Sequence, residues 1–293
     1  MQFPKMMRVR QTFDSREIDD IAEAVEAGMA ALDVSTRVKP GQTVAVACSS
    51  RGITNYSAIV AAVVGALKSR QLDVFVIPAM GSHGAATAEG QERVLAHLGI
   101  TKVSVGAPVR SSLEVVQIGQ TGQGIPVYLD KLASEADHIV LVNRIKKHTE
   151  FEHKFESGLM KMMAIGLGKQ AGAAMYHQAM LSFGYANVIQ SIADNVLQRA
   201  NILCGVGIVE NGYGQTAKIG IGLREKIEAQ EIELFKLAKS LSPALPFEEA
   251  DIIVIDEMGK DISGTGFDTK VVGRLGLPLV TPDPESPNIK RIV

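Results

Sequence analysis

The stretch TVAVACSSRGITNYSAIVAAVVGALKSR, residues 43–70, decides the fold of this protein. It begins with an apolar run at 43–49, which predicts a buried strand after the turn signal KPGQ at 39–42. A polar loop follows at 50–55, and the spacing of apolar residues over 56–70 predicts a helix. A buried strand that leads into a helix through a short polar loop is the repeating unit of a parallel sheet covered by helices.

The same alternation of strand and helix continues on both sides of this stretch. Apolar runs predict strands, helical spacing of apolar residues predicts helices, and two apolar runs joined by a turn signal predict a hairpin. The first helix is expected to take its N-cap from Asp14 or Ser15. The patterns place strands at 73–80 and 138–143, helices at 15–32, 87–99, near 180–198 and at 223–241, a hairpin at 202–211 and 214–223, and the start of a new strand-loop unit at 251–264.

The sequence therefore predicts an α/β protein with an open, mostly parallel sheet, helices on both faces and two lobes. We expect residues 1–248 to form an N-terminal α/β lobe that holds the functional site. Residues 249–293 are expected to begin a second α/β lobe that is incomplete, whether truncated or shortened.

The composition argues against several classes of partner. With 293 residues, 46% of them hydrophobic and 21% charged, the chain resembles ordinary soluble globular proteins. A net charge of -2 without a long run of Lys or Arg argues against binding to nucleic acid. The most apolar stretch, 58–67, is about half of the roughly 20 residues that a membrane-spanning helix needs, so no membrane is expected. The charged N-terminus MQFPKMMRVRQTF lacks a secretory pattern, which predicts a cytoplasmic protein.

Polar residues follow the predicted strands and are the first candidates for a site. Ligands of open α/β sheets bind at the carboxyl ends of the strands, because these ends meet at one edge of the sheet. The segments in question are Cys48–Gly52, Gly81–Gly84, Asn143–His148 and Asp256–Lys260.

The first two of these segments carry an anion-binding pattern and a histidine. Ser50 and Arg51 precede a helix, where hydroxyl, guanidinium and helix N–H groups bind phosphate, although simple helix capping explains the same residues equally well. His83 lies in a loop between Ser and Gly and is expected to be exposed. It is therefore a better functional candidate than His97 and His138, which lie in regular elements.

The third segment ends in His148, directly after a basic run at 144–147. Such a run is most often a solvated charged face of the protein. Nearby positive charge also lowers the pKa of a histidine, which keeps the ring neutral and able to act as a base near neutral pH. His153 competes with His148 for this role, and spacing does not separate the two.

A glycine-rich segment at 154–178 carries Lys161 and His177. Glycine lets the backbone pass close to a bulky ligand, and a lysine in apolar surroundings loses affinity for its proton and becomes nucleophilic. Composition alone favours another interpretation, a packed Met-rich helix pair whose lysines extend to solvent.

Four motifs in order give the chain a resemblance to a known family. GSHG at 81–84, NRIKKH at 143–148, SGLMK at 157–161 and the later His177 together resemble the N-terminal lobe of the nickel-dependent lactate racemase family. The resemblance covers nearly the whole chain. It implies two α/β lobes with the active site between them and a nickel-pincer nucleotide as cofactor.

The resemblance also implies a role for each candidate residue. By matching position, Lys161 resembles the lysine that tethers the cofactor covalently, and His177 resembles the protein ligand to nickel. His83 and His148 resemble the acid/base pair. The cofactor-binding residues implied in this way are Lys161, Arg51, Ser50 and Gly158.

The activity that the resemblance implies is racemisation or epimerisation of a small, lactate-like 2-hydroxy acid. Family members work by reversible hydride transfer to the cofactor, and separate biosynthetic proteins make that cofactor. Cys48 stands where members of the family commonly have an acid, which leaves the substrate open. Lys260, Lys270 and Arg274 receive no assigned role.

Two other classes of function remain open from the residues. His83, His148, His153 and His177 are enough donors for a zinc-dependent hydrolase or lyase. Cys48 and Cys204 lie in separate apolar runs and are expected to be buried thiols, which excludes cysteine-rich metal sites only. The second class is a non-catalytic lobe that binds a nucleotide or metal.

Overall fold

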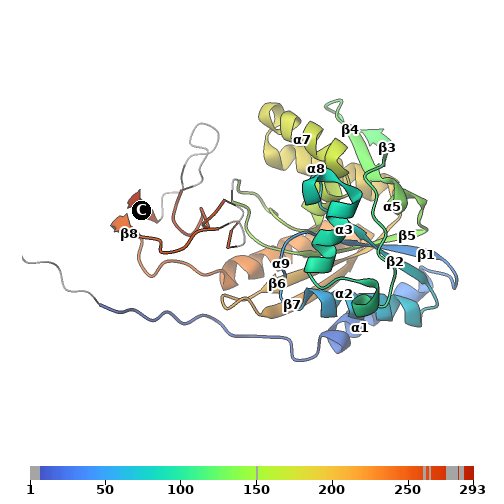
Figure 1. The fold of residues 1–293 in the computed structure, drawn as a ribbon, viewed down its shortest axis with the longest axis horizontal. Helices are drawn as coiled ribbons and strands as arrows, with labels where there is room; N and C mark the ends of the chain where they lie inside the picture. Colours follow the sequence, from blue (N-terminus) through green and yellow to red (C-terminus); the bar gives the residue numbers. More distant parts are fainter. Residues whose placement is uncertain (1–6, 150, 260–261, 264, 275–282, 284–286) are drawn as a thin grey trace, which may run out of the picture.

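The computed structural model describes residues 7–149, 151–259, 262–263, 265–274, 283 and 287–293. Its centre is a sheet with the strand order β2-β1-β5-β6-β7 (Figure 1). All neighbouring strands are parallel except β7, which runs antiparallel to β6. The expected α/β fold with a mostly parallel sheet is confirmed. The strands are β1 Thr43–Cys48, β2 Asp73–Pro78, β5 His138–Arg144, β6 Ile202–Glu210 and β7 Thr216–Leu223.

The strands of this sheet are apolar along their length because both faces are covered. Side chains alternate between the two faces, so Val44 and Val46 pack into one core and Ala45 and Ala47 into the other. On the first face the core is closed by α1 (Ile21–Ala31) and α2 (Tyr56–Ser69), and on the second by α8 (Tyr185–Arg199) and α9 (Ile227–Leu241).

Shorter elements complete the main body of the protein. Strands β3 and β4, which lie between β2 and β5 in the sequence, form an antiparallel hairpin that packs onto the second core. This hairpin was not expected from the sequence. None of the helices in the described residues is both long enough and apolar enough to cross a lipid bilayer. The elements are η1 Val34–Thr36, η2 Gly84–Ala86, α3 Ala88–His97, α4 Lys102–Val105, β3 Val115–Gln120, β4 Pro126–Asp130, α5 Lys131–Glu135 and η4 Arg224–Lys226.

Two helix predictions were wrong in their bounds. The first helix begins at Ile21, because the carboxylate of Asp20 caps it by accepting from Glu23 N at 2.9 Å. The helix expected near 180–198 is α8, which begins only at Tyr185, because residues 180–183 end a separate helix, α7 (Lys169–Phe183), that meets α8 at Gly184 with φ +80°. Two glycines of the glycine-rich segment, Gly168 and Gly172, lie directly before α7 and inside it.

Close packing within α7 explains these glycines. A Cβ added to Gly172 would lie 2.8 Å from the Tyr176 ring, and one added to Gly168 would lie 3.0 Å from the same ring. The glycines therefore make room for a buried aromatic side chain one turn or two turns further along the helix.

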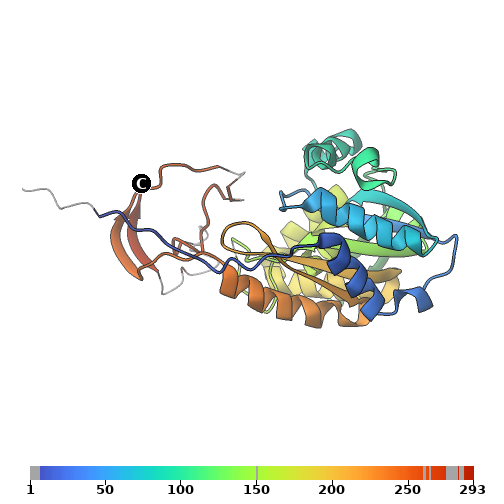
Figure 2. The same cartoon turned by 90° about the horizontal axis from the view of Figure 1, so that it is seen from below.

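The C-terminal part forms a separate, two-stranded parallel sheet of β8 (Glu249–Ile253) and β9 (Asn288–Ile292). Figures 1 and 2 both show this pair apart from the main sheet. The chain between the two strands returns to the main body, where Thr269 Oγ1 donates to Thr149 O at 2.6 Å. The strand expected from residue 251 is confirmed, whereas the assignment of 249–293 to a second lobe stays a prediction.

The loop that carries His83 depends on a close contact between two glycines, which a substitution can test. A Cβ added to Gly90 in α3 would lie 1.8 Å from Gly84 O. We therefore expect Gly90→Ala to lower the free energy of unfolding by about 1–3 kcal/mol, measured by urea denaturation.

Gly65→Ala is the matched control in α2, because a Cβ there meets no atom within 4 Å. The control should raise stability by roughly 0.5–1 kcal/mol, the usual gain from alanine in a helix. Equal effects of the two substitutions would contradict the close-packing argument.

Candidate functional site

The carboxyl ends of β1, β2 and β5 lie side by side and are followed by the three polar loops expected from the sequence. Between these loops and α7 lies a cavity of about 740 Å³. Its lining contains all but one of the site residues that the family resemblance implied. Gly158 is absent, and Ser50, Arg51, His83, His148, Lys161 and His177 are present. Residues more than 100 positions apart in the sequence thus share one cavity.

The β1 loop holds the ring of His83. Ser50 Oγ makes a short hydrogen bond with His83 Nδ1, which fixes the orientation of the imidazole whichever atom donates. The loop itself is anchored because Ser49 N donates to the buried hydroxyl of Tyr56 at 2.7 Å. That hydroxyl donates in turn to Val142 O at 3.1 Å, on β5. The Ser50 position therefore follows from the packing of α2 against the sheet.

His148 is fixed through its backbone and held neutral by its surroundings. Its N–H donates to Glu156 Oε2 at 2.5 Å. Burial and then the positive charges of Lys161, Lys270 and Lys146 lower the pKa of His148 to about 2. The ring is therefore uncharged at neutral pH, as the sequence analysis expected of this residue.

The structure separates His148 from its competitor, His153. The His153 ring packs edge-to-face on Phe155 with a centroid distance of 4.7 Å and does not line the cavity. His148 instead faces Tyr185, at 5.7 Å between ring centroids, and His177 lies 6.3 Å from the same tyrosine. Tyr185 at the start of α8 therefore lies near the rings of both histidines.

Lys161 ends the short helix α6 (Leu159–Lys161), which continues into η3, a π-helical turn at Met162–Gly166. Such wide turns are rare and occur mostly at functional sites. The start of α6 is capped from α9, because the buried carboxylate of Glu231 accepts from Met160 N at 2.8 Å. Lys161 thus reaches the cavity from a helix that a carboxylate on α9 caps.

Gly158 has a packing role in this arrangement. A Cβ on Gly158 would lie 2.1 Å from Glu231 Oε1 and 2.7 Å from Ile145 Cδ1. Gly158 therefore leaves room for the Glu231 carboxylate that caps α6, and Gly158 itself does not line the cavity. Its role in binding a cofactor stays a prediction.

The lining of the cavity is strongly cationic. Its side chains include no Asp or Glu among the described residues, whereas several are basic. Burial and then the charge of Arg144 lower the pKa of Lys146 to about 8. An anionic ligand is favoured in such a cavity, since it replaces the hydration that the cations lose. The basic residues are Arg51, Arg144, Lys146, Lys147 and Lys161.

Several residues around the cavity were not named individually as site candidates from the sequence. Lys146 and Lys147 were included only in the strand-end segment Asn143–His148, whose basic run also suits a solvated face. His97 was expected to be structural or at the surface, yet all three residues line the cavity. Tyr185 carried no local signal because its position depends on where α7 ends. Glu156 carried no local signal either, because its partners, His148 and Lys270, lie on two other segments of the chain.

Lys260, Lys270 and Arg274, which received no role from the sequence, differ in their surroundings. Lys270 donates to Glu156 Oε2 at 2.8 Å and to Phe151 O at 2.8 Å, beside His148. Arg274 pairs with Asp283 at 2.9 Å. Lys260 lies outside the described residues. Within the described part of the chain, no three His, Cys, Asp or Glu side chains gather as a metal-binding group.

Comparison with known proteins identifies the family and a similar fold. The model of the lactate racemase N-terminal domain matches residues 5–187. The chain belongs to this family. The lactate racemase apoprotein from Thermoanaerobacterium thermosaccharolyticum is similar in fold, with a TM-score of 0.57 and 17% sequence identity over 82% of this chain and 60% of that chain. No curated protein sequence matches the chain.

The uncharged state of the His148 ring gives a first prediction. By NMR we expect its ring not to titrate between about pH 4 and pH 8, because burial and three lysines oppose its protonation. Lys161→Ala should raise the pKa, whereas Lys154→Ala, which removes a cation paired with Glu228, should leave it unchanged. Titration near the ordinary value of 6.5 in the unaltered protein would contradict the assignment.

The buried cap of α6 gives a second prediction. Burial raises the pKa of Glu231 from 4.5 to about 7. Between these values the folded protein binds more protons at this site than the unfolded chain does, so stability falls as the pH rises from about 4.5 to about 7. Glu231→Gln keeps an oxygen acceptor for Met160 N and should flatten this pH dependence in urea unfolding.

Stability that falls equally steeply in Glu231→Gln over this pH range would overturn the argument. Glu233→Gln on the same helix is the control, because Glu233 is exposed and pairs only with exposed Lys236. It should leave the pH dependence as it is in the unaltered protein.

Proposed function

We propose that this chain is the N-terminal lobe of a racemase or epimerase that inverts a small 2-hydroxy acid by reversible hydride transfer to a nickel-pincer nucleotide. One observation carries the proposal: two histidines of the expected acid/base pair, a lysine and a third histidine line one cationic cavity. Family membership supports the isomerase class. The chain spans 60% of the length of the racemase whose fold it shares, so the complete active site is part of the proposal.

The donor set of the cavity fits the implied cofactor. A volume of about 740 Å³ lies in the range of small-molecule and cofactor sites. Lys161 would hold the cofactor covalently, and His177 would provide an imidazole nitrogen to its nickel. Ser50 and Arg51 would bind its phosphate through a hydroxyl and a guanidinium. When bound, the cofactor supplies a reversible acceptor for the hydride on the substrate Cα.

The remaining chemistry belongs to side chains of the chain itself. His148 is neutral at physiological pH, so its imidazole nitrogen accepts the proton of the substrate hydroxyl group. His83, whose ring Ser50 orients, gives a proton to the same substrate oxygen when the opposite stereoisomer forms, and both histidines regain their starting protonation by exchange with solvent. A substrate carboxylate in this cavity is bound by the basic lining residues, of which Lys146 and Lys147 stand closest in sequence to His148.

Other parts of the proposal concern the surroundings of the site. We infer that residues 249–293 begin the second lobe and that separate biosynthetic proteins supply the cofactor in the cytoplasm. Lys270 donates to Glu156, and Glu156 also accepts from His148 N. This link supports a second lobe that contacts the acid/base site.

The first experiment is intact-mass and nickel analysis of the protein co-expressed with the cofactor-making enzymes, followed by peptide mapping. We expect a nickel-containing adduct on Lys161 that Lys161→Ala abolishes, because the primary amine is the point of attachment. Lys154→Ala, which lies outside the cavity lining, should retain the adduct. An unchanged cofactor mass on Lys161→Ala would remove the proposed tether.

With loaded protein, exchange of hydrogen isotope at the substrate Cα tests the acid/base pair. His83→Ala and His148→Ala should each lower the rate by about 10²–10⁴, the usual contribution of a positioned proton donor or acceptor. Unchanged rates in both variants would contradict the pair. Cofactor retention without exchange in the unaltered protein would favour the non-catalytic lobe, and bound zinc without an adduct would favour the hydrolase or lyase.

A further inference from the structure

Lys169, the first residue of α7, combines two costly features. It has φ +53°, in the left-handed region where side chains other than glycine are uncommon. Its side chain is 0% exposed, and lysine is almost never fully buried without a partner. A glycine would relieve the backbone strain, so the side chain itself must be required at this place.

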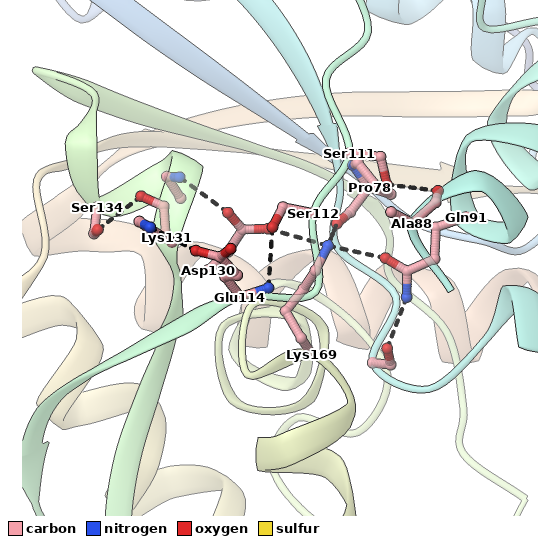
Figure 3. A network of polar contacts seen from close by, with 12 residues as sticks. Pro78, Ala88, Gln91, Ser111, Ser112, Glu114, Asp130, Lys131, Ser134 and Lys169 are labelled. Carbon is pink, nitrogen blue, oxygen red and sulfur yellow. Dashed lines mark hydrogen bonds and ion pairs between the residues drawn. The ribbon is translucent and has the colours of Figure 1, made fainter. Parts of the chain in front are cut away.

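The ammonium group of Lys169 joins three separate elements (Figure 3). It pairs with Asp130 Oδ2 at 3.0 Å, at the end of β4. It donates to Pro78 O at 2.7 Å, at the end of β2, and to Gln91 Oε1 at 2.9 Å, on α3. The contacts with Pro78 O and Gln91 Oε1 are hydrogen bonds and the contact with Asp130 is an ion pair, so the ammonium group is compensated both in hydrogen bonding and in charge. Asp130 is also 0% exposed, so each charge is the other's main compensation.

Gln91 continues the network to the loop that carries His83. Its amide nitrogen donates to Gly81 O at 2.8 Å and to His83 O at 3.3 Å. An amide suits this place because its oxygen must accept from Lys169 while its nitrogen donates to two carbonyls, and a carboxylate cannot donate. The buried Gln91 therefore transmits the position of Lys169 to the backbone of Gly81 and His83.

The same two parts of the chain also meet through their backbones. Gly81 N donates to Gly166 O at 3.3 Å, and Asp130 N donates to Leu167 O at 2.7 Å, in each case just before Lys169 in the sequence. Backbone hydrogen bonds thus join the segment before α7 to the loop of His83 and to the end of β4, the same two places that the ammonium network reaches. His177 lies on α7, two turns beyond Lys169.

We propose that Lys169 is a positioning residue which, through Gln91, fixes the loop of His83 relative to α7 and hence to His177. The lysine lies outside the cavity lining and touches neither histidine side chain. Its consequence for catalysis rests on the proposed racemase function, whereas its effect on the loop does not.

Hydrogen–deuterium exchange in the cofactor-free protein tests the effect on the loop. Gln91→Met removes the bridge and leaves the pair of Lys169 with Asp130 in place. We expect the amides of Gly81 and His83 to exchange at least about 10-fold faster, because the carbonyls that anchor their loop lose a donor. The amides of α2 should keep their rates.

A second variant covers the case in which Gln91→Met does not fold. Lys169→Met with Asp130→Asn removes both charges together, so neither is left buried alone, and should give the same local increase. Arg70→Met is the matched control, because it breaks the pair of Arg70 with Glu26 at 2.8 Å, away from the cavity. It should leave the loop amides unchanged.

Unchanged exchange at Gly81 and His83 would overturn the proposal. An equal increase throughout the protein would overturn it as well, because Lys169 would then stabilise the whole fold and position nothing in particular. In loaded enzyme, Gln91→Met should lower kcat with KM nearly unchanged and with the adduct on Lys161 retained. If the unaltered protein shows no racemisation, the proposed function fails, and the exchange result still decides the positioning role.

Discussion

The parallel pairing of β1 with β2 on one side and with β5 on the other is the constraint on which the site depends. It places three strand ends at one edge of the sheet, so the loops of Ser50, His83 and His148 lie together although they are far apart in the sequence. The pairing is stable because every inward side chain of β1 is buried between two cores. The edge where the site lies is therefore a consequence of the strand pairing that also forms the core.

Charge is distributed unevenly around this edge. The cavity is lined by basic side chains, while nearby carboxylates lie outside the lining: Glu210 pairs with Arg144, Glu156 accepts from His148 N, and Glu231 caps α6. This separation keeps the cavity positive for an anionic ligand and keeps His148 neutral through the lowering of its pKa. Among the described residues no cation pairs with the buried carboxylate of Glu231, which makes the cap of α6 sensitive to pH.

Part of this was predictable from local patterns. The strands, α2, α3 and α9 follow from the period of apolar residues, and the loops after the strands follow from the rule on strand ends. His83, His148, Lys161 and His177 were found by motif and order, and the structure places them around one cavity. The break between α7 and α8 was missed, because the glycines of α7 serve packing on Tyr176 that no local pattern reveals.

The sequence by itself determined the α/β fold, the residue types of the site and the family, because hydrophobic period and short motifs are local properties. The tertiary structure alone decided that His148 and not His153 faces the cavity, that Gly158 stands behind its wall, and that Lys169 joins β2, β4 and α3. These outcomes depend on burial and on partners far away in the chain. A charge such as Lys169 is costly or useful only according to what folding places beside it.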